Sequence, residues 1–524
     1  MIASPLSRRL FAATLATLSL SLAVPSFAQQ PQRNAPRGEQ NREAARDQSR
    51  DQNRDQPGEA RRLPADVTTD QSVELSGRTL RFKAVAGSIP INNLEGKLQA
   101  EVAFIAYLRP DTGATRPLTF VFNGGPGASS AYMQLGALGP WRLPLDNITP
   151  SSPTTLVPNQ ETWLDFTDLV FVDPVGTGYS RFINQSDELR KQFWSVGGDI
   201  DVLATFMRKW IEKNGRQASR KFIAGESYGG FRAPKLAGKL HEQGVAVSGL
   251  VMVSPVLDFG WRGNGRQSPF AWVVRLPSMA AAARDAGAPF DREALREVER
   301  YAEGEYLQDL LRGEHDEAAV DRISTRVAQL TGLDRTLVRR LAGRVDPRTF
   351  TRERGRDRGI VASMYDATVT GIDPDPNAAN SHFDDPVLDG TRAPLSTAMT
   401  DLYARVLNWR VEEPYELLNN RVSSRWDWGG SRFTNEIFDQ LRASLAFDPH
   451  LRVLIAHGAS DLVTPYFENQ MIVDQMPAFA SPDRLKLAVY GGGHMFYSRD
   501  ASRRALRDDA ERLYRVGEQA PPRG

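Results

Sequence analysis

The 524-residue sequence contains no cysteine, which excludes disulfide bonds, thiol catalysis and cysteine-ligated metal sites. It also lacks an excess of charge, since 65 Lys and Arg residues balance 64 Asp and Glu residues and leave a formal net charge of +1. This balance gives no reason to expect a nucleic-acid partner. Histidine is scarce, with six residues in all, so few candidates exist for a catalytic base. The remaining composition is that of a globular protein.

Long apolar runs are lacking apart from residues 10–24. Arg8 and Arg9 precede this run, and the small residues Ser26 and Ala28 follow it at the spacing that a signal peptidase reads. We therefore expect residues 1–28 to be a secretory signal that directs the chain to the periplasm or the exterior. An uncleaved membrane anchor is the alternative, but the run is shorter than the ~20 residues that a spanning helix needs. No stable membrane span is expected after signal removal.

Large apolar side chains are almost absent from residues 29–62, which consist mainly of Gln, Arg, Asp, Asn and Pro. Such a composition cannot bury enough surface to offset the conformational entropy lost on ordering. The segment is predicted to be a disordered linker.

The rest of the chain alternates between strand and helix patterns. Residues 71–108 show the two-residue alternation of antiparallel strands. Short apolar runs typical of strands buried on both faces follow at 118–122, 169–172, 222–224, 250–253, 453–456 and 485–489. Helical patterns such as 199–213 separate the middle runs. This order predicts an α/β fold with a mostly parallel central sheet covered by helices.

The strand pattern stops between the two parts of this core, predicted at residues 63–257 and 444–524. Residues 258–443 contain helical patterns at 291–312, 316–331, 334–341 and 397–410, with no strong strand run. We expect a mainly helical insertion that forms a lid over the site. A helical domain remote from the chemistry is the alternative.

A catalytic nucleophile is indicated at Ser227, within the sequence KFIAGESYGGFR of residues 221–232. An apolar run precedes Gly225-Glu226-Ser227-Tyr228-Gly229, and a helix is predicted over 232–240. A G-x-S-x-G motif between a strand and a helix is the context of a nucleophile elbow, in which glycines permit the sharp turn that exposes the serine. The motif also arises by chance, so further residues are needed.

The partners of such a serine are expected downstream, in the order acid and then histidine. Asp461 follows the run 453–456, and His494 follows the run 485–489 after three glycines. Both lie where parallel strands end, which is where open α/β sheets place their sites. Asp461 is predicted to orient His494 as the base. His457 competes for that role, but it precedes Asp461 and is expected to pack under the loop.

Two backbone N–H groups are needed to stabilise an oxyanion. The amide of Tyr228, next to the nucleophile, is one candidate. The other is expected from the glycine-rich loop of residues 123–130, NGGPGASS. That loop lacks the glycine spacing and the lysine of phosphate-binding loops.

Five motifs occur in order: residues 123–130 (NGGPGASS), 173–180 (DPVGTGYS), 225–230 (GESYGG), the Asp461 loop, and 492–495 (GGHM). Together they resemble the serine carboxypeptidase family of α/β hydrolases, from about residue 118 to the C-terminus without most of the insertion. The resemblance implies an α/β-hydrolase fold with a triad of Ser227, Asp461 and His494. It implies no metal and no organic cofactor.

The resemblance also implies binding roles. The amides of Gly125 and Tyr228 form the oxyanion hole, and Asn123, Gly124 and Glu226 hold the free C-terminal carboxylate of a peptide substrate. In the family, the motif glutamate bonds as a neutral acid. This fits activity at acidic pH, because only a protonated carboxyl can donate to a carboxylate.

Three positions depart from the family pattern. The usual tryptophan two residues before the motif asparagine is Val121, and the usual cysteine after Pro-Gly is Ala128. The glutamate that usually shares a proton with the motif glutamate is Ala137. Losing that carboxyl leaves the pH optimum and the strictness of C-terminal recognition open.

The sequence thus predicts an exported serine carboxypeptidase whose partner is a peptide with a free C-terminus. An esterase or acyltransferase using the same acyl-enzyme is an alternative that the departures allow. A catalytically silent binding protein is a second. The preferred substrate side chains and the oligomeric state are not indicated by the sequence.

Overall fold

The computed structural model describes residues 63–516, except 111–112, 147, 185, 264–265, 285–289, 380 and 480. The predicted signal at 1–28 and the predicted linker at 29–62 lie outside the described residues. None of the helices described is both long and apolar enough to span a bilayer.

A ten-stranded sheet organises the chain, and its main order is β1-β2-β3-β7-β4-β9-β10-β13-β14. The first strands, β1 (Val67–Leu75), β2 (Arg78–Asn92) and β3 (Leu98–Leu108), pair antiparallel, and so do β3 and β7 (Asp168–Val172). A short strand, β8 (Arg181–Phe182), also pairs with β3. From β7 onward the pairing is parallel. The parallel strands are β4 (Leu118–Phe122), β9 (Lys221–Glu226), β10 (Gly249–Val253), β13 (Arg452–Gly458) and β14 (Leu485–Tyr490).

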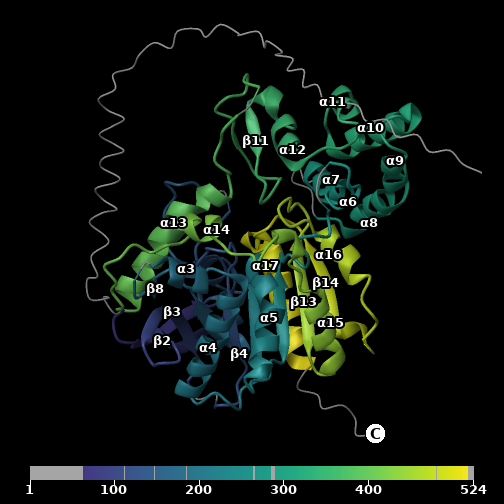
Figure 1. Cartoon of the computed structure of the whole chain (residues 1–524). Helices are drawn as coiled ribbons and strands as arrows, with labels where there is room; N and C mark the ends of the chain where they lie inside the picture. The colour runs from purple at the N-terminus through teal and green to yellow at the C-terminus, as the bar shows by residue number, and fades with distance from the viewer. Residues whose placement is uncertain are drawn as a thin grey trace, which may run out of the picture. The chain divides into compact units, whose positions relative to one another are not determined.

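The parallel strands are apolar because helices cover both faces of the sheet. Along β10, Leu250 and Met252 belong to one core, and Val251 and Val253 to another, as the alternation of side chains in a strand requires. The first core includes residues of α4 (Val196–Lys213), α5 (Tyr228–Glu242) and α15 (Phe438–Phe447), which are labelled in Figure 1. The second includes residues of α13 (Leu388–Asp401) and α17 (Asp500–Val516).

The strands and the fold class predicted from the sequence are confirmed. Each predicted apolar run lies within a strand of the sheet, and the alternating region before residue 108 forms the antiparallel strands. The helix expected at 199–213 is the greater part of α4, and that expected at 232–240 lies within α5. The result is an α/β fold with a mostly parallel central sheet.

Between β10 and β13 the chain is mainly helical. The α-helices are α6 (Phe270–Val273), α7 (Leu276–Arg284), α8 (Arg292–Tyr301), α9 (Leu307–Arg312), α10 (Glu317–Thr331), α11 (Arg335–Arg340), α12 (Pro347–Glu353), α13, α14 (Asn420–Ser424) and α15. One small hairpin, β11 (Ile360–Ala362) with β12 (Thr370–Ile372), interrupts them. A third apolar core joins α7, α8 and α10 to α16 (Tyr466–Val473) and to Leu462 in the loop after β13. This loop also carries Asp461.

The helix predicted at 397–410 has different bounds. Asp385 accepts hydrogen bonds from the amides of Val387 and Leu388, so the helix begins before Pro394, a residue that commonly marks a helix boundary. A π-helical turn extends it to Val406, and Asn408 then takes a left-handed conformation with φ of 54°, which ends the helix.

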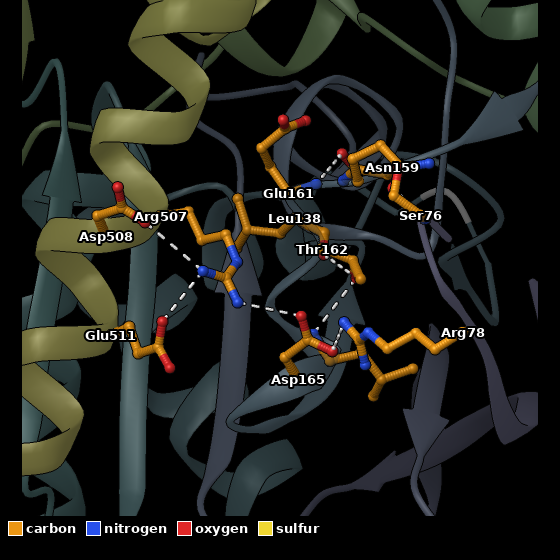
Figure 2. Close-up of polar contacts among 12 residues, drawn as sticks. Ser76, Arg78, Leu138, Asn159, Glu161, Thr162, Asp165, Arg507, Asp508 and Glu511 are labelled. Atoms are coloured by element: carbon orange, nitrogen blue, oxygen red, sulfur yellow. Dashed lines mark hydrogen bonds and ion pairs between the residues drawn. The ribbon is translucent and has the colours of Figure 1, made fainter. Parts of the chain in front are cut away.

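The C-terminal helix α17 is fastened to the first half of the chain by ion pairs (Figure 2). Arg507 contacts Asp165 and Glu511, each at 3.0 Å, and Asp508 at 3.5 Å. Arg78 of β2 contacts the other oxygen of Asp165 at 2.6 Å. Since α17 directly follows the loop of His494, these contacts help to hold that loop against the sheet.

Candidate active site

Ser227 lies at a sharp turn between β9 and α5, with φ of 58° and ψ of −121°. A positive φ is unfavourable for a residue with a side chain, and such strain gathers at functional positions. The flanking glycines are required, because a Cβ at Gly225 would lie 2.1 Å from the Gly229 carbonyl oxygen. A Cβ at Gly229 would lie 2.3 Å from the Phe122 carbonyl oxygen. The elbow thus packs tightly against the end of β4 and leaves Ser227 half-buried.

Asp461 and His494 form a buried pair at the ends of β13 and β14. The Nδ1 atom of His494 lies 2.7 Å from Oδ2 of Asp461. Asp461 also accepts hydrogen bonds from the amides of Val463 and Thr464, at 2.8 and 3.0 Å, and from the Thr464 hydroxyl at 2.6 Å. These donors keep the carboxylate oriented toward the imidazole.

The backbone of His494 is held at both of its polar groups. Its amide donates to the Tyr365 carbonyl at 2.5 Å, and its carbonyl accepts from the Ser254 hydroxyl at 2.8 Å. The Tyr365 ring lies edge-on to the imidazole, with ring centroids 5.4 Å apart. Burial acts to lower the pKa of His494, but the Asp461 carboxylate prevails and holds that pKa above its ordinary value.

Ser227 and His494 are both hydrogen-bonded to residues at the end of β10. The Ser227 amide donates to the Val253 carbonyl at 2.8 Å, and the next residue, Ser254, bonds to His494. Among the described residues, no hydrogen bond joins the Ser227 hydroxyl to the imidazole. The competing His457 is fully buried and bonds through Nε2 to Asn469 at 2.8 Å. Burial lowers the pKa of His457 to about 4, so it is a neutral packing residue.

The glycine-rich loop lies directly against the elbow. A Cβ at Gly124 would lie 2.5 Å from the Tyr228 amide nitrogen and 2.8 Å from Cβ of Ser227. Gly125 has φ of 100°, which a glycine adopts without strain. The Gly124 carbonyl accepts from the Ala128 amide at 3.1 Å and so closes the turn. The structure thus brings the backbone of Gly124 to Ser227 and Tyr228, with Gly125 as the next residue.

Glu226 is a buried carboxyl, with 3% of its surface exposed. Its Oε2 atom accepts from Asn123 Nδ2 and from the Tyr497 hydroxyl, the latter at 2.8 Å. Asn123 is itself oriented, because its Oδ1 accepts from the Met133 amide at 3.0 Å. Burial raises the pKa of Glu226 to about 6, although His494 and these hydrogen bonds act to lower it. The structure therefore brings Asn123 and Glu226 together beside Ser227.

Tyr497 is a site residue that sequence reasoning missed. It follows His494 by three positions, so its nearness to the histidine was the available signal. Its ring packs on the segment that carries Ala137, since a Cβ at the preceding Gly136 would lie 2.6 Å from Tyr497 Cε2. A hydroxyl thus bonds to Glu226 next to the position where the family pattern has a second carboxyl.

Arg232 was also missed, although it stands only five residues after the nucleophile. It is fully buried, and its Nε lies 2.6 Å from Asp199 of α4. Its Nη1 donates to the Asn123 carbonyl at 2.6 Å. The sequence offered one signal for Arg232, namely a charged residue within a helix that is expected to cover the sheet. Arg232 couples α4 and α5 to the loop that carries Asn123.

Two cavities are formed mainly by residues of the insertion. The larger, about 1530 Å³, is lined mainly by residues of the insertion, including Met364, Asp389 and Gly390. The smaller, about 600 Å³, is lined by Val463 of the Asp461 loop and by residues that follow β10. Met364 also accepts, through its carbonyl, a hydrogen bond from the Leu462 amide, so a residue that lines the larger cavity contacts the Asp461 loop.

The family model described as "Serine carboxypeptidase" matches residues 76–258. This segment contains the glycine-rich loop and Ser227 but neither Asp461 nor His494. Serine carboxypeptidase-like 28 of Arabidopsis thaliana is 30% identical over 203 residues, 36% of this chain and 41% of the relative. Pheromone-processing carboxypeptidase kex1 of Aspergillus niger is 36% identical over 163 residues, 30% of this chain and 24% of the relative. The chain thus spans less than half the length of these curated relatives.

A solved structure extends the likeness to most of the fold. The chain superposes on Kex1(delta)p, a prohormone-processing carboxypeptidase from Saccharomyces cerevisiae, with a TM-score of 0.55 and 17% identity. The match covers 83% of this chain and 91% of that one. At this identity the likeness shows the fold alone, which is that of the α/β hydrolases.

Proposed function

We propose that the chain is a serine carboxypeptidase, in line with the family model that matches residues 76–258, and that it hydrolyses the C-terminal bond of peptides through an acyl-enzyme. The observation that carries this proposal is the hydrogen bond of Asn123 to Glu226. Glu226 directly precedes Ser227 and lies close enough to His494, the partner of Asp461, for the histidine to affect its pKa. A nucleophile, an oriented base and a buried carboxyl of raised pKa then share one site.

In the proposed reaction, Ser227 Oγ attacks the carbonyl carbon of the terminal peptide bond. His494 takes the hydroxyl proton through Nε2, the nitrogen not bonded to Asp461, and the carboxylate stabilises the resulting imidazolium. His494 then protonates the leaving amine, and the free C-terminal amino acid departs. Water, activated by the same imidazole, releases the shortened peptide from Ser227.

The negative charge of each tetrahedral intermediate needs preorganised donors. We assign this role to the amides of Gly125 and Tyr228. The packing of Gly124 against the Tyr228 nitrogen supports the assignment, because it fixes the spacing between the two segments. Both amides belong to backbone that is held by hydrogen bonds or by a helix, so little reorganisation is needed during the reaction.

The substrate carboxylate is proposed to bind at Asn123, Gly124 and Glu226. Both internal hydrogen bonds of Glu226 end on Oε2, which leaves Oε1 for a ligand. With the pKa of Glu226 at about 6, the neutral form is available at mildly acidic pH and donates to a carboxylate. An amide or ester at the same position offers no charge for this donor.

We further propose that residues 258–443 act as a lid and that residues 1–28 direct export. The lid role is supported by contacts of the insertion with the site, since the Tyr365 carbonyl accepts from the His494 amide. The export role is supported by the apolar run and its flanking residues in the sequence.

The decisive experiment compares a blocked dipeptide that has a free C-terminus with the same dipeptide as its C-terminal amide. We expect cleavage of the free acid and at least a tenfold lower kcat/KM for the amide. Equal rates on both would contradict the carboxypeptidase function and favour an esterase or acyltransferase. A fluorophosphonate probe provides the second arm. Labelling that disappears in Ser227→Ala is expected, whereas absence of labelling in the folded wild-type protein would contradict any serine hydrolase.

A further inference from the structure

The smaller cavity is lined by cationic side chains. Its charged lining residues are Arg262, Arg266, Arg275 and Arg432, and no acidic side chain lines it among the residues described. Phe259, Trp272 and Phe433 supply apolar walls. A volume of about 600 Å³ falls within the range of ligand pockets and exceeds the volume of any single amino-acid side chain.

Two of these arginines have no ion pair among the described residues. Arg275 donates from Nη1 to the Ala271 carbonyl at 2.6 Å, but its buried Nε has no hydrogen-bond partner. Arg432 stacks on the rings of Phe259 and Trp428, at 4.4 and 4.9 Å from their centroids. Burial and the nearby Arg262 lower the pKa of both guanidinium groups. A cavity with cations so close together favours an anion.

The other two arginines are already paired. Arg262 contacts the buried Glu468 at 3.0 Å, and Arg266 contacts the exposed Glu314 at 3.5 Å. Of the acidic groups around the cavity, Glu468 and Asp346 act on Arg275, and Asp258 acts on Glu468. None of these three lines the cavity, and neither Arg275 nor Arg432 forms an ion pair among the described residues, so both remain available to a ligand.

The sheet order places this cavity on one side of Ser227 and the carboxylate site on the other. The strands β4, β9, β10 and β13 are neighbours in that order. Asn123 follows β4 and Ser227 follows β9. The cavity residues Phe259 and Arg262 follow β10, and Val463 follows β13. Arg432 is also close enough to Tyr228 to affect its pKa. A peptide with its terminal carboxylate at Glu226 therefore extends its acyl part toward the arginines.

The larger cavity lies on the side of Glu226. Thr391 and Glu226 both lie close enough to Tyr132 to affect the pKa of its hydroxyl, which burial raises, and Thr391 adjoins Gly390 of that cavity. With a peptide bound in this way, the two cavities fall on the two sides of its scissile bond. The larger one faces the leaving amino acid, and the arginine-lined one faces the acyl residue.

We propose that the arginine-lined cavity binds an acidic side chain on the substrate's penultimate residue, the residue whose carbonyl Ser227 attacks. This inference rests on the proposed carboxypeptidase function and adds a substrate class to it. The Glu or Asp carboxylate lies between Arg275 and Arg432, and its methylene groups pack against the aromatic walls. A charge-assisted hydrogen bond in such a partly open cavity is expected to change kcat/KM about tenfold.

The test uses N-blocked dipeptides that differ only in the penultimate residue, Glu, Gln or Lys, assayed with the full chain at about pH 5.5. At this pH a peptide Glu, with an ordinary pKa of about 4.3, is mostly ionised. We expect kcat/KM to be about tenfold higher for Glu than for Gln, and lowest for Lys. The ratio of Glu to Gln should fall in 1 M salt, because exposed charges are screened.

The variant Arg432→Gln is expected to lower the Glu-to-Gln ratio about threefold, and Arg432→Lys to restore part of it. Arg442→Gln is the matched control. Arg442 is also exposed and also lies over an aromatic ring, that of Phe438 at 5.7 Å, but it belongs to α15 and does not line the cavity.

Because the readout is a ratio, a uniform loss of activity does not alter it. Equal kcat/KM for the Glu and Gln peptides in the wild type would overturn this inference while the carboxypeptidase function stood. Failure to cleave every peptide would overturn both.

Discussion

The two sides of Ser227 differ in how their charges are used. On the side of β4, Glu226 is buried and already bonded to Asn123 and Tyr497. On the side of β10 and β13, Arg275 and Arg432 line a cavity, and neither of these two arginines forms an ion pair among the described residues. The first side derives from loops of the sheet, whereas most of the second side belongs to the insertion.

This difference separates chemistry from selectivity. Groups with internal hydrogen bonds are held in place before a substrate arrives, which suits steps that are common to every substrate. Cations without partners gain the most from an incoming anion, which suits discrimination between substrates. Changes on the sheet side should therefore affect all peptides alike, and changes in the cavity should affect the Glu-to-Gln ratio.

The largest effect is expected from Asp461→Asn. The amide cannot hold His494 as the carboxylate does, so kcat should fall about 10⁴-fold on every peptide, as for other catalytic triads. The ratio of Glu to Gln peptides should not change. Asp474→Asn, an exposed position on the segment after α16, serves as the control for steady-state kinetics. A loss confined to the Glu peptide would contradict the separation of the two sides.

Gly124→Ala tests the packing of the glycine-rich loop on the elbow. The added Cβ would meet the Tyr228 nitrogen at 2.5 Å and the Glu226 carbonyl oxygen at 2.7 Å, so the loop must move away from Ser227. We expect kcat to fall about 10²-fold, the cost of one misplaced oxyanion donor. Gly197→Ala is the control, because nothing lies within 4 Å of a Cβ there. Full activity of Gly124→Ala would argue against Gly125 as an oxyanion donor.

Arg232→Met tests the support of the Asn123 loop. The substitution leaves the Asp199 carboxylate buried without its partner, which typically costs about 3–5 kcal/mol of unfolding free energy. Arg208→Met, which removes an exposed pair with Glu212, should cost less than about 0.5 kcal/mol. Denaturant unfolding of both variants measures the difference. Similar stabilities would show that the buried pair does not support this side of the site.

Tyr497→Phe should give the smallest effect, a shift in the pH dependence of KM. In the wild type, KM should rise as the pH passes about 6, because ionised Glu226 repels the substrate carboxylate. The Tyr497 hydrogen bond favours the charged form and lowers the pKa of Glu226. Its removal therefore raises that pKa and moves the rise in KM to higher pH.

The control for this shift is Tyr490→Phe, whose hydroxyl bonds to Asp509 instead. It should leave the KM profile in place. In Glu226→Gln, the rise in KM above pH 6 should disappear, because the amide does not ionise. A profile that stayed the same in Tyr497→Phe would show that the hydroxyl does not govern Glu226.

Much of the core was predictable because local patterns determine it. The apolar runs of the parallel strands, the glycines around Ser227 and the loop of Asn123 are each contiguous in the chain, and their positions at strand ends follow from the order of the elements. The start of α13 was not predictable in this way, since the helix continues through Pro394 and the amides at its start bond to the Asp385 side chain. The sequence also predicted Ser227, Asp461 and His494 as the catalytic residues, and the structure brings Asp461 and His494 into contact.

The tertiary structure alone decided what surrounds those residues. Tyr497 reaches Glu226 across 271 positions of the chain, and Arg232 reaches Asn123 across 109. The arginines of the cavity come from segments after β10 and before β13 that no local pattern relates. Hydrogen bonds and charge clusters of this kind depend on the packing of distant segments, whereas strands and elbows depend on neighbouring residues. The sequence by itself therefore determined the fold and predicted the nucleophile, and packing decided the state of Glu226 and the charge beside Ser227.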